Sequence, residues 1–301
     1  MCYVSHRPTA VASVTDITRG KRGASMLDTL ARTPARTLRW GIDLGLSATR
    51  TVGRALRLGL DAGIYLAVDT VRLRHPLRET LLQAWFIVSV TAFPAVLVSI
   101  PFGVIVSVQV GSLTQQVGAT SIAGAAGGLG VIRQGAPIVA ALLLGGAAGS
   151  AIAADLGART IREEIDAMRT MGIDPVRRLV APRLAAMAAM APLLCLVIVF
   201  MGVGTGYLIN VGAQGGTPGS YLSSFASFAT ISDLFVALAK SILFGVIVVI
   251  VACQRGLEAT HGPKGVANAV NAAVVIGVMA AFGVNLVITQ LVSMFMPTRI
   301  G

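Results

Sequence analysis

The sequence predicts an all-α polytopic membrane protein, and three observations support this fold class. Of the 301 residues, 55% are hydrophobic and only 12% are charged, whereas a soluble domain is about 25% charged. The mean hydropathy is +0.80, so the chain has too few polar groups to cover its own surface in water. The apolar residues also gather in runs that are long enough for membrane-spanning helices of about 20 residues.

The N-terminal part of the chain divides into two regions. Residues 1–32 are polar and basic, and we expect a disordered tail. Residues 33–78 begin with Thr33 and Pro34, which are typical of a helix start. Polar side chains then recur every three or four positions, which predicts an amphipathic helix in the membrane interface. They are Arg36, Arg39, Asp43, Ser47, Arg50, Arg54, Arg57 and Asp61. A soluble helix packed on another subunit is the alternative, and we expect no cleaved signal peptide.

Five membrane spans are predicted within residues 79–297. We place them at residues 81–110, 134–154, 184–209, 234–253 and 266–296. Two small-residue patterns, Gly145-xxx-Gly149 and Gly202-xxx-Gly206, predict close packing between these helices. The loops next to the predicted inner side hold 21 of the 24 basic residues. Because basic loops stay in the cytoplasm, we expect the N-terminus inside and the C-terminus outside.

The charged loop after the second span contains its own start and stop signals. Thr160 and Glu163 have the spacing of a capping box, which predicts a helix over residues 161–171. Gly172 is a typical left-handed terminator. Asp174 and Pro175 then predict the start of the next helix.

One face of this short predicted helix is apolar. Ile161, Ile165, Met168 and Met171 follow helical spacing, and charged residues surround them. Such a ridge in a cytoplasmic loop predicts docking into a groove on a soluble partner. The alternative is that the ridge lies on the membrane surface or on the protein's own helices.

The sequence around this loop resembles one family. The stretches that carry the resemblance are RQGAP (133–137), ADLGAR (154–159), EEIDAM (163–168), MGIDP (171–175) and LVAPR (179–183). They are similar to the signature of MlaE/YrbE permeases, the membrane subunits of ABC transporters that work with Mce-domain proteins. GPKGVANAV (262–270) resembles the actinobacterial and mycobacterial branch. The resemblance covers residues 65 to 297.

This resemblance implies a lipid-transporting permease in the plasma membrane with several partners. A cytoplasmic ATPase would bind a coupling helix at about residues 160–172. A second YrbE-like permease, identical or paralogous, would enclose a lipid cavity with this chain, and Mce proteins would lie on the outer side. The cargo would be fatty acids, mycolic acids or sterols. The expected ATPase-contact residues are Ile161, Glu163, Glu164, Ile165, Asp166, Met168, Met171, Gly172 and Asp174.

Charged residues within the spans are candidates for binding the lipid. Arg133 and Lys240 could pair with a headgroup or a fatty-acid carboxylate, although a salt bridge or snorkelling would also explain them. Asp233 lies two turns from Lys240, about 10 Å along a helix, which is too far for a direct pair. Analogy with the family adds Phe93, Phe102 and Asn285 as candidates.

The sequence carries no motif for catalysis, for a cofactor, for a metal or for nucleic acid. Lys264 is followed by Gly265, so GPKG is not a phosphate-binding loop. We therefore expect this chain not to be an enzyme and ATP to be used by a separate ATPase subunit. A secondary transporter or channel would need internal repeats or mid-membrane acids, which we do not find. A membrane scaffold that recruits a cytoplasmic partner shares the docking ridge and stays open.

Overall fold

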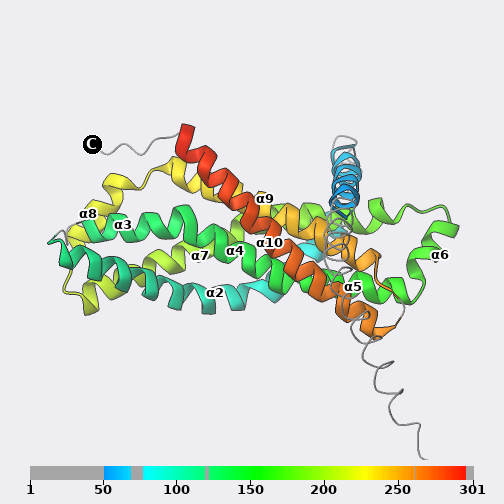
Figure 1. Ribbon diagram of the computed structural model, residues 1–301, viewed down its shortest axis with the longest axis horizontal. Helices are drawn as coiled ribbons and strands as arrows, with labels where there is room; N and C mark the ends of the chain where they lie inside the picture. The colour runs from blue at the N-terminus through cyan, green and yellow to red at the C-terminus, as the bar shows by residue number, and fades with distance from the viewer. Residues whose placement is uncertain (1–50, 69–76, 119–121, 261, 296–301) are drawn as a thin grey trace, which may run out of the picture. The chain divides into compact units, whose positions relative to one another are not determined.

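The computed structural model describes residues 51–68, 77–118, 122–260 and 262–295, which form helices joined by short turns (Figure 1). Five helices in these ranges are long and apolar enough to cross a membrane, which confirms the predicted number of spans. They are Leu77–Gln116, Ala123–Ile161, Val176–Ala213, Ile231–Leu257 and Pro263–Met294. The predicted tail at residues 1–32 lies outside the described residues, and the side of the membrane on which each end lies stays a prediction.

The five spans correspond to the following elements. The first is α2 (Leu77–Gln116), and the fourth and fifth are α9 (Ile231–Leu257) and α10 (Pro263–Phe295). The second runs through α3 (Ala123–Gly130), η2 (Val131–Gly135), α4 (Ala136–Leu143), η3 (Leu144–Gly149) and α5 (Ser150–Ile161). The third joins η4 (Val176–Val180) to α7 (Ala181–Ala213). Two short helices, α6 (Glu164–Thr170) and α8 (Pro218–Phe228), lie between spans.

The second span is longer than predicted at both ends, because it runs from Ala123 to Ile161 instead of from residue 134 to residue 154. The extra turns at its start include α3, which is rich in glycine and lies against α8. A Cβ atom at Gly124 or Gly128 would overlap with Tyr221 or Phe225 of α8. The glycines therefore allow the two helices to approach closely, and this packing outweighs their low helix propensity.

Two short π-helical segments, η2 and η3, interrupt the second span, and a third, η4, begins the third span. A π-helical turn breaks the regular ladder of backbone hydrogen bonds, and such turns frequently occur at functional sites. The segments η2 and η4 each carry residues that are central to the polar networks described below.

The spans pack around α7 and α9. Helix α7 lies along α2 and also contacts α9, which in turn packs on α5 and α10. Helix α6 lies at one end of this bundle, while α3 and α8 meet at the opposite end (Figure 1). We call these the α6 end and the α8 end.

Small residues let the spans approach one another, as the sequence predicted. A Cβ atom at Gly145 would lie 2.8 Å from the Val278 side chain, and one at Gly149 would lie 3.0 Å from Val248. A Cβ atom at Gly202 would lie 3.0 Å from Val131. Each of these glycines therefore faces another helix, and larger side chains would push the spans apart.

The predicted interfacial helix over residues 33–78 is described only in part. Residues 51–68 are helical, whereas residues 33–50 and 69–76 lie outside the described ranges. Leu58, Ala62 and Leu66 pack against the core of the chain. Leu56, Leu60, Ile64 and Val68 form an exposed apolar stripe on another face. The helix therefore has two apolar faces, one against the protein and one free to meet lipid.

Candidate functional site

The connection between the second and third spans, residues 162–174, forms the first candidate site, and we call it the α6 segment. Helix α6 ends as predicted at Gly172, which has a φ of +74°. The Gly172 N–H donates to the Arg169 carbonyl at 3.0 Å, and the Ile173 N–H donates to the Met168 carbonyl at 2.9 Å. This pair of bonds is a Schellman motif. The predicted cap at Asp174 is also confirmed, because its Oδ1 accepts from the Val176 N–H at 2.9 Å.

The start of this helix differs from the prediction. Glu163 has a φ of 60° and makes no side-chain cap, so the predicted capping box is wrong. Thr160 and Ile161 instead complete the last turn of α5. The Thr160 hydroxyl lies 2.9 Å from the Leu156 carbonyl and 3.1 Å from the Gly256 carbonyl of α9. This cross-helix bond accounts for the longer α5.

The apolar ridge predicted to face a partner is partly wrong. Ile165 is only 3% exposed and belongs to the core of this chain, and Met168 packs against the same core. Met171, in contrast, is 65% exposed. The alternative of a ridge on the protein's own helices therefore holds for Ile165 and Met168. Helical periodicity predicts that this face is buried, but it does not identify the surface that covers the face.

The remaining predicted contact residues are distributed over the free surface of the α6 segment. Glu164 and Ile161 are half-buried. Exposed positions are Glu163, Asp166, Met171, Gly172 and Asp174. Arg169 donates to Asp166 at 3.1 Å across this surface. The α6 segment thus presents an exposed face of mixed charge with two large apolar side chains, Met171 and Ile173.

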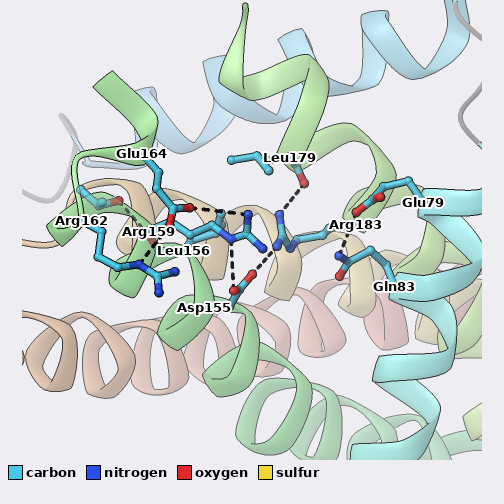
Figure 2. A network of polar contacts seen from close by, with 10 residues as sticks. Glu79, Gln83, Asp155, Leu156, Arg159, Arg162, Glu164, Leu179 and Arg183 are labelled. Carbon is cyan, nitrogen blue, oxygen red and sulfur yellow. Dashed lines mark hydrogen bonds and ion pairs between the residues drawn. The ribbon is translucent and has the colours of Figure 1, made fainter. Parts of the chain in front are cut away.

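A network of ion pairs holds the α6 segment to the adjacent spans (Figure 2). Asp155 of α5 accepts from Arg159 at 3.2 Å through Oδ1, and its Oδ2 accepts from Arg183 of α7. Arg159 also lies 3.8 Å from the Glu164 carboxylate of α6. Arg162 approaches the same carboxylate at 3.0 Å. Charges from three helices therefore form one connected chain.

Arg183 is the most deeply buried member of this network. Its side chain is 3% exposed, whereas those of Asp155 and Arg159 are 38% and 36% exposed. Besides the bond to Asp155, Nη1 of Arg183 donates to the Leu179 carbonyl of η4 at 2.8 Å. Burying a guanidinium is costly unless it is paired and hydrogen-bonded. The carboxylate and the carbonyl supply these partners.

A second group of polar residues lies between α9, α10 and η2, and we call it the α9 cluster: Arg133, Gln134, Asp233, Lys240, Asn285 and Thr289. Nε of Arg133 donates to Asp233 at 2.8 Å, and its Nη2 donates to the other carboxylate oxygen at 3.2 Å. Asp233 also completes a capping box with Thr230 at the start of α9. One carboxylate therefore fixes both the start of α9 and the π-helical turn of the second span.

Lys240 sits deeper in the α9 cluster and has only neutral partners in the described ranges. The residue is 4% exposed, and its Nζ donates to the Thr289 hydroxyl at 2.9 Å and to the Arg133 carbonyl at 3.4 Å. Gln134 donates to Thr289 at 3.4 Å and accepts from the Asn285 amide at 3.5 Å. The buried Asn285 Oδ1 has no partner in the structure's described part.

The structure brings three of the five predicted lipid-site residues together: Arg133, Lys240 and Asn285. Phe102 packs against the second span at Gly135, where its ring occupies the space that a Cβ atom would need. Phe93 is 71% exposed on α2. Asp233 pairs with Arg133, whereas Lys240 bonds Thr289 and the Arg133 carbonyl, so these bonds agree with the prediction that Asp233 and Lys240 do not pair directly. Gln134 and Thr289 were missed because neutral side chains leave no charge signal.

A cavity of about 270 Å³ opens at the α8 end. Its lining residues are neutral and include Thr114, Asn210, Gln214 and Ser220. Gln214 bridges two helices by donating to the Ser107 carbonyl at 3.2 Å and accepting from Asn210 at 3.2 Å. None of the predicted lipid-site residues lines this cavity.

The comparison with known families identifies the class of protein. The family model described as Permease MlaE matches residues 80–291, which covers the second, third and fourth spans, the α6 segment and nearly all of the first and fifth spans. This chain belongs to the MlaE permease family. It is a multi-pass inner-membrane protein with the role of a permease.

Individual relatives agree with this membership. A probable ABC transporter permease of Synechocystis sp. is 34% identical over 63% of this chain and 72% of its own length. A probable ABC transporter permease of Rickettsia typhi is 32% identical over 54% of this chain. The intermembrane phospholipid transport permease MlaE of Haemophilus influenzae is 29% identical over 54% of this chain. The match spans 63% of the length of each of the last two relatives.

Proposed function

We propose that this MlaE-family chain is the membrane subunit of an ATP-driven lipid transporter. The proposal is based mainly on the α6 segment. This segment has an exposed face that is available to a partner, and ion pairs connect it to the second and third spans. Relatives named ABC transporter permeases support a partner ATPase, and the Haemophilus relative supports a lipid cargo.

The proposed ATPase contact is the exposed part of the α6 segment. Met171 and Ile173 are 65% and 43% exposed, and Asp166 lies on the same free surface. An exposed apolar side chain with a rim of charge is typical of a docking contact. We place this surface in the cytoplasm, because residues 155–183 carry six basic side chains whereas residues 210–232 carry no charge.

The proposed transport pathway requires further subunits. A second YrbE-like permease would complete a cavity for the lipid, and Mce proteins would receive or deliver it at the α8 end, which we place outside. The α9 cluster supplies basic groups for a lipid headgroup or carboxylate. Fatty acids, mycolic acids and sterols are the proposed cargo classes. ATP hydrolysis belongs to the separate ATPase.

Native purification through a tag on this chain tests the proposal. Mass spectrometry of the purified material should detect an ATPase subunit, a second permease, Mce proteins and extracted lipid. Recovery of this chain alone, active as a homo-oligomer in liposomes, would contradict the proposal and favour a channel or secondary transporter. Recovery of an ATPase with unchanged uptake of every lipid in a deletion strain would favour a scaffold.

A further inference from the structure

The α6 segment must be held to the spans if it is to move them, because α6 has only seven residues. Its apolar anchors are Ile165, which is buried in the core, and Met168, which packs against the same core. Apolar contact is non-directional, so these side chains hold α6 against a surface without fixing its direction as a hydrogen bond does. Charge-assisted hydrogen bonds fix direction as well as distance.

Four charged side chains supply this link, and we call them the relay: Arg183, Asp155, Arg159 and Glu164 (Figure 2). Its first two steps are hydrogen bonds, and its last step, from Arg159 to Glu164, is an ion pair at 3.8 Å. They join α7 to α5 and α5 to α6 through successive ion pairs. Asp155 is the junction, because each of its carboxylate oxygens accepts a hydrogen bond from a different arginine.

Arg183 connects the relay to the backbone of the third span. Its Nη1 bonds the Leu179 carbonyl inside η4, while Nη2 bonds Asp155. The planar guanidinium therefore joins a π-helical turn at the start of the third span to the end of the second. A lysine has a single nitrogen and would be poorly suited to hold both partners in this geometry.

We infer that Arg183 and Asp155 are positioning residues that make α6 and the adjacent ends of the second and third spans move as one body. A force that an ATPase applies to α6 then displaces α7. Stability alone gives little reason for such a pair, since an apolar replacement of similar volume is often equally stable. The inference rests on the proposed function, because it needs a partner that moves α6.

The test uses the full complex with its ATPase and two pairs of spin labels, with Cys2 replaced by serine. The buried Cys195 and Cys253 are left in place. Labels at the exposed positions Ala167 of α6 and Leu193 of α7 report movement of α6 against the third span. Labels at Leu193 and at Leu286 of α10 report movement of the third span itself. Distances are measured before and after trapping with ATP and vanadate.

In the unaltered chain, trapping should leave the α6–α7 distance unchanged and shift the α7–α10 distance. In Arg183→Met, trapping should shift the α6–α7 distance and leave the α7–α10 distance unchanged, while the ATPase stays bound. Arg183→Lys should show a partial loss of the α7–α10 shift. Arg178→Met is the matched control, because Arg178 lies in η4, five positions before Arg183 at the start of the third span, and is exposed.

Each alternative result has a separate meaning. Loss of the ATPase from the unaltered complex would contradict the proposed function. A bound ATPase with wild-type distance changes in Arg183→Met would overturn the relay alone, as would an α7–α10 distance that never shifts. If Arg183→Met does not fold, Arg159→Met breaks the next step of the relay at a side chain that is 36% exposed, and the same two outcomes apply.

Discussion

The α6 end and the α9 cluster both contain a buried basic side chain, but they balance its charge differently. Arg183 is paired with the carboxylate of Asp155 and belongs to a chain of ion pairs. Lys240 is bonded to a hydroxyl and a carbonyl, both neutral. The first site therefore neutralises its buried cation with an acid, whereas Lys240 in the second site has no acidic partner among the described residues. We associate the first with holding helices together and the second with ligand.

Removing the carboxylate of Asp155 should have the largest effect on stability. Asp155→Asn leaves Arg183 buried without a counter-charge, and we expect a loss of about 2 kcal/mol, reduced from the value for a fully buried pair because Asp155 is 38% exposed. Thermal unfolding in detergent measures the change. The control Asp166→Asn breaks an exposed pair and should change stability by at most about 0.5 kcal/mol. Equal effects of the two variants would contradict the assigned role of Asp155.

Crowding at the same end should have the next largest effect. A Cβ atom at Gly256 would lie 2.7 Å from Leu156 Cβ and 3.1 Å from the Ala153 carbonyl. Gly256→Ala should therefore separate α9 from α5, weaken the Thr160 bond and lower stability by about 1 to 2 kcal/mol. The same unfolding assay applies. Gly204→Ala has open space around it and should be neutral or stabilising by up to about 1 kcal/mol, so a comparable loss there would show that packing is not the cause.

The α9 cluster should respond in the opposite direction. Lys240→Met replaces a buried cation by an apolar side chain of similar length, and we expect stability to stay constant or to rise by about 1 kcal/mol. Lipid co-purification, measured by mass spectrometry, should fall if the cation meets the headgroup. A stability loss as large as that of Asp155→Asn would remove the distinction between the two sites.

The smallest effect concerns the contact between Tyr65 and the α6 segment. The Tyr65 hydroxyl donates to the Asp174 carboxylate, and this bond raises the pKa of Tyr65 above its ordinary value of 10.0. Because the folded chain holds the phenol proton more tightly, the contribution is present below pH 10 and is lost as the pH rises further. Unfolding midpoints between pH 8 and 11 should fall at the alkaline end, and Tyr65→Phe should reduce this fall. An identical pH dependence of the unfolding midpoint for the unaltered chain and Tyr65→Phe would rule out a contribution of the Tyr65–Asp174 bond.

Local rules predicted the parts of the fold that depend on neighbouring residues. The five spans followed from apolar length, and the turn at Gly172 and the cap at Asp174 followed from residue type. Contacts between distant residues were not predictable in this way. Asp155 and Arg183 are 28 positions apart, and Lys240 and Thr289 are 49 apart, so no periodicity connects them.

The prediction that Ile165 faces a partner was wrong for a similar reason, because it also depends on contacts between distant residues. Helical spacing identifies an apolar face, and burial of that face is favourable whether the covering surface belongs to the same chain or to a partner. The sequence of one chain does not distinguish the two. The exposed Met171 is therefore a better position than Ile165 for testing contact with a partner.

A photocrosslinking amino acid at position 171 tests the central claim most directly. Met171 lies on the exposed face of the α6 segment, and position 222 in α8, where Leu222 is 56% exposed, serves as the comparison at the opposite end. The account predicts that irradiation of whole cells links position 171, and not position 222, to a nucleotide-binding ATPase subunit. Crosslinks from position 171 to lipid alone, or equal capture of the ATPase from both positions, would contradict it.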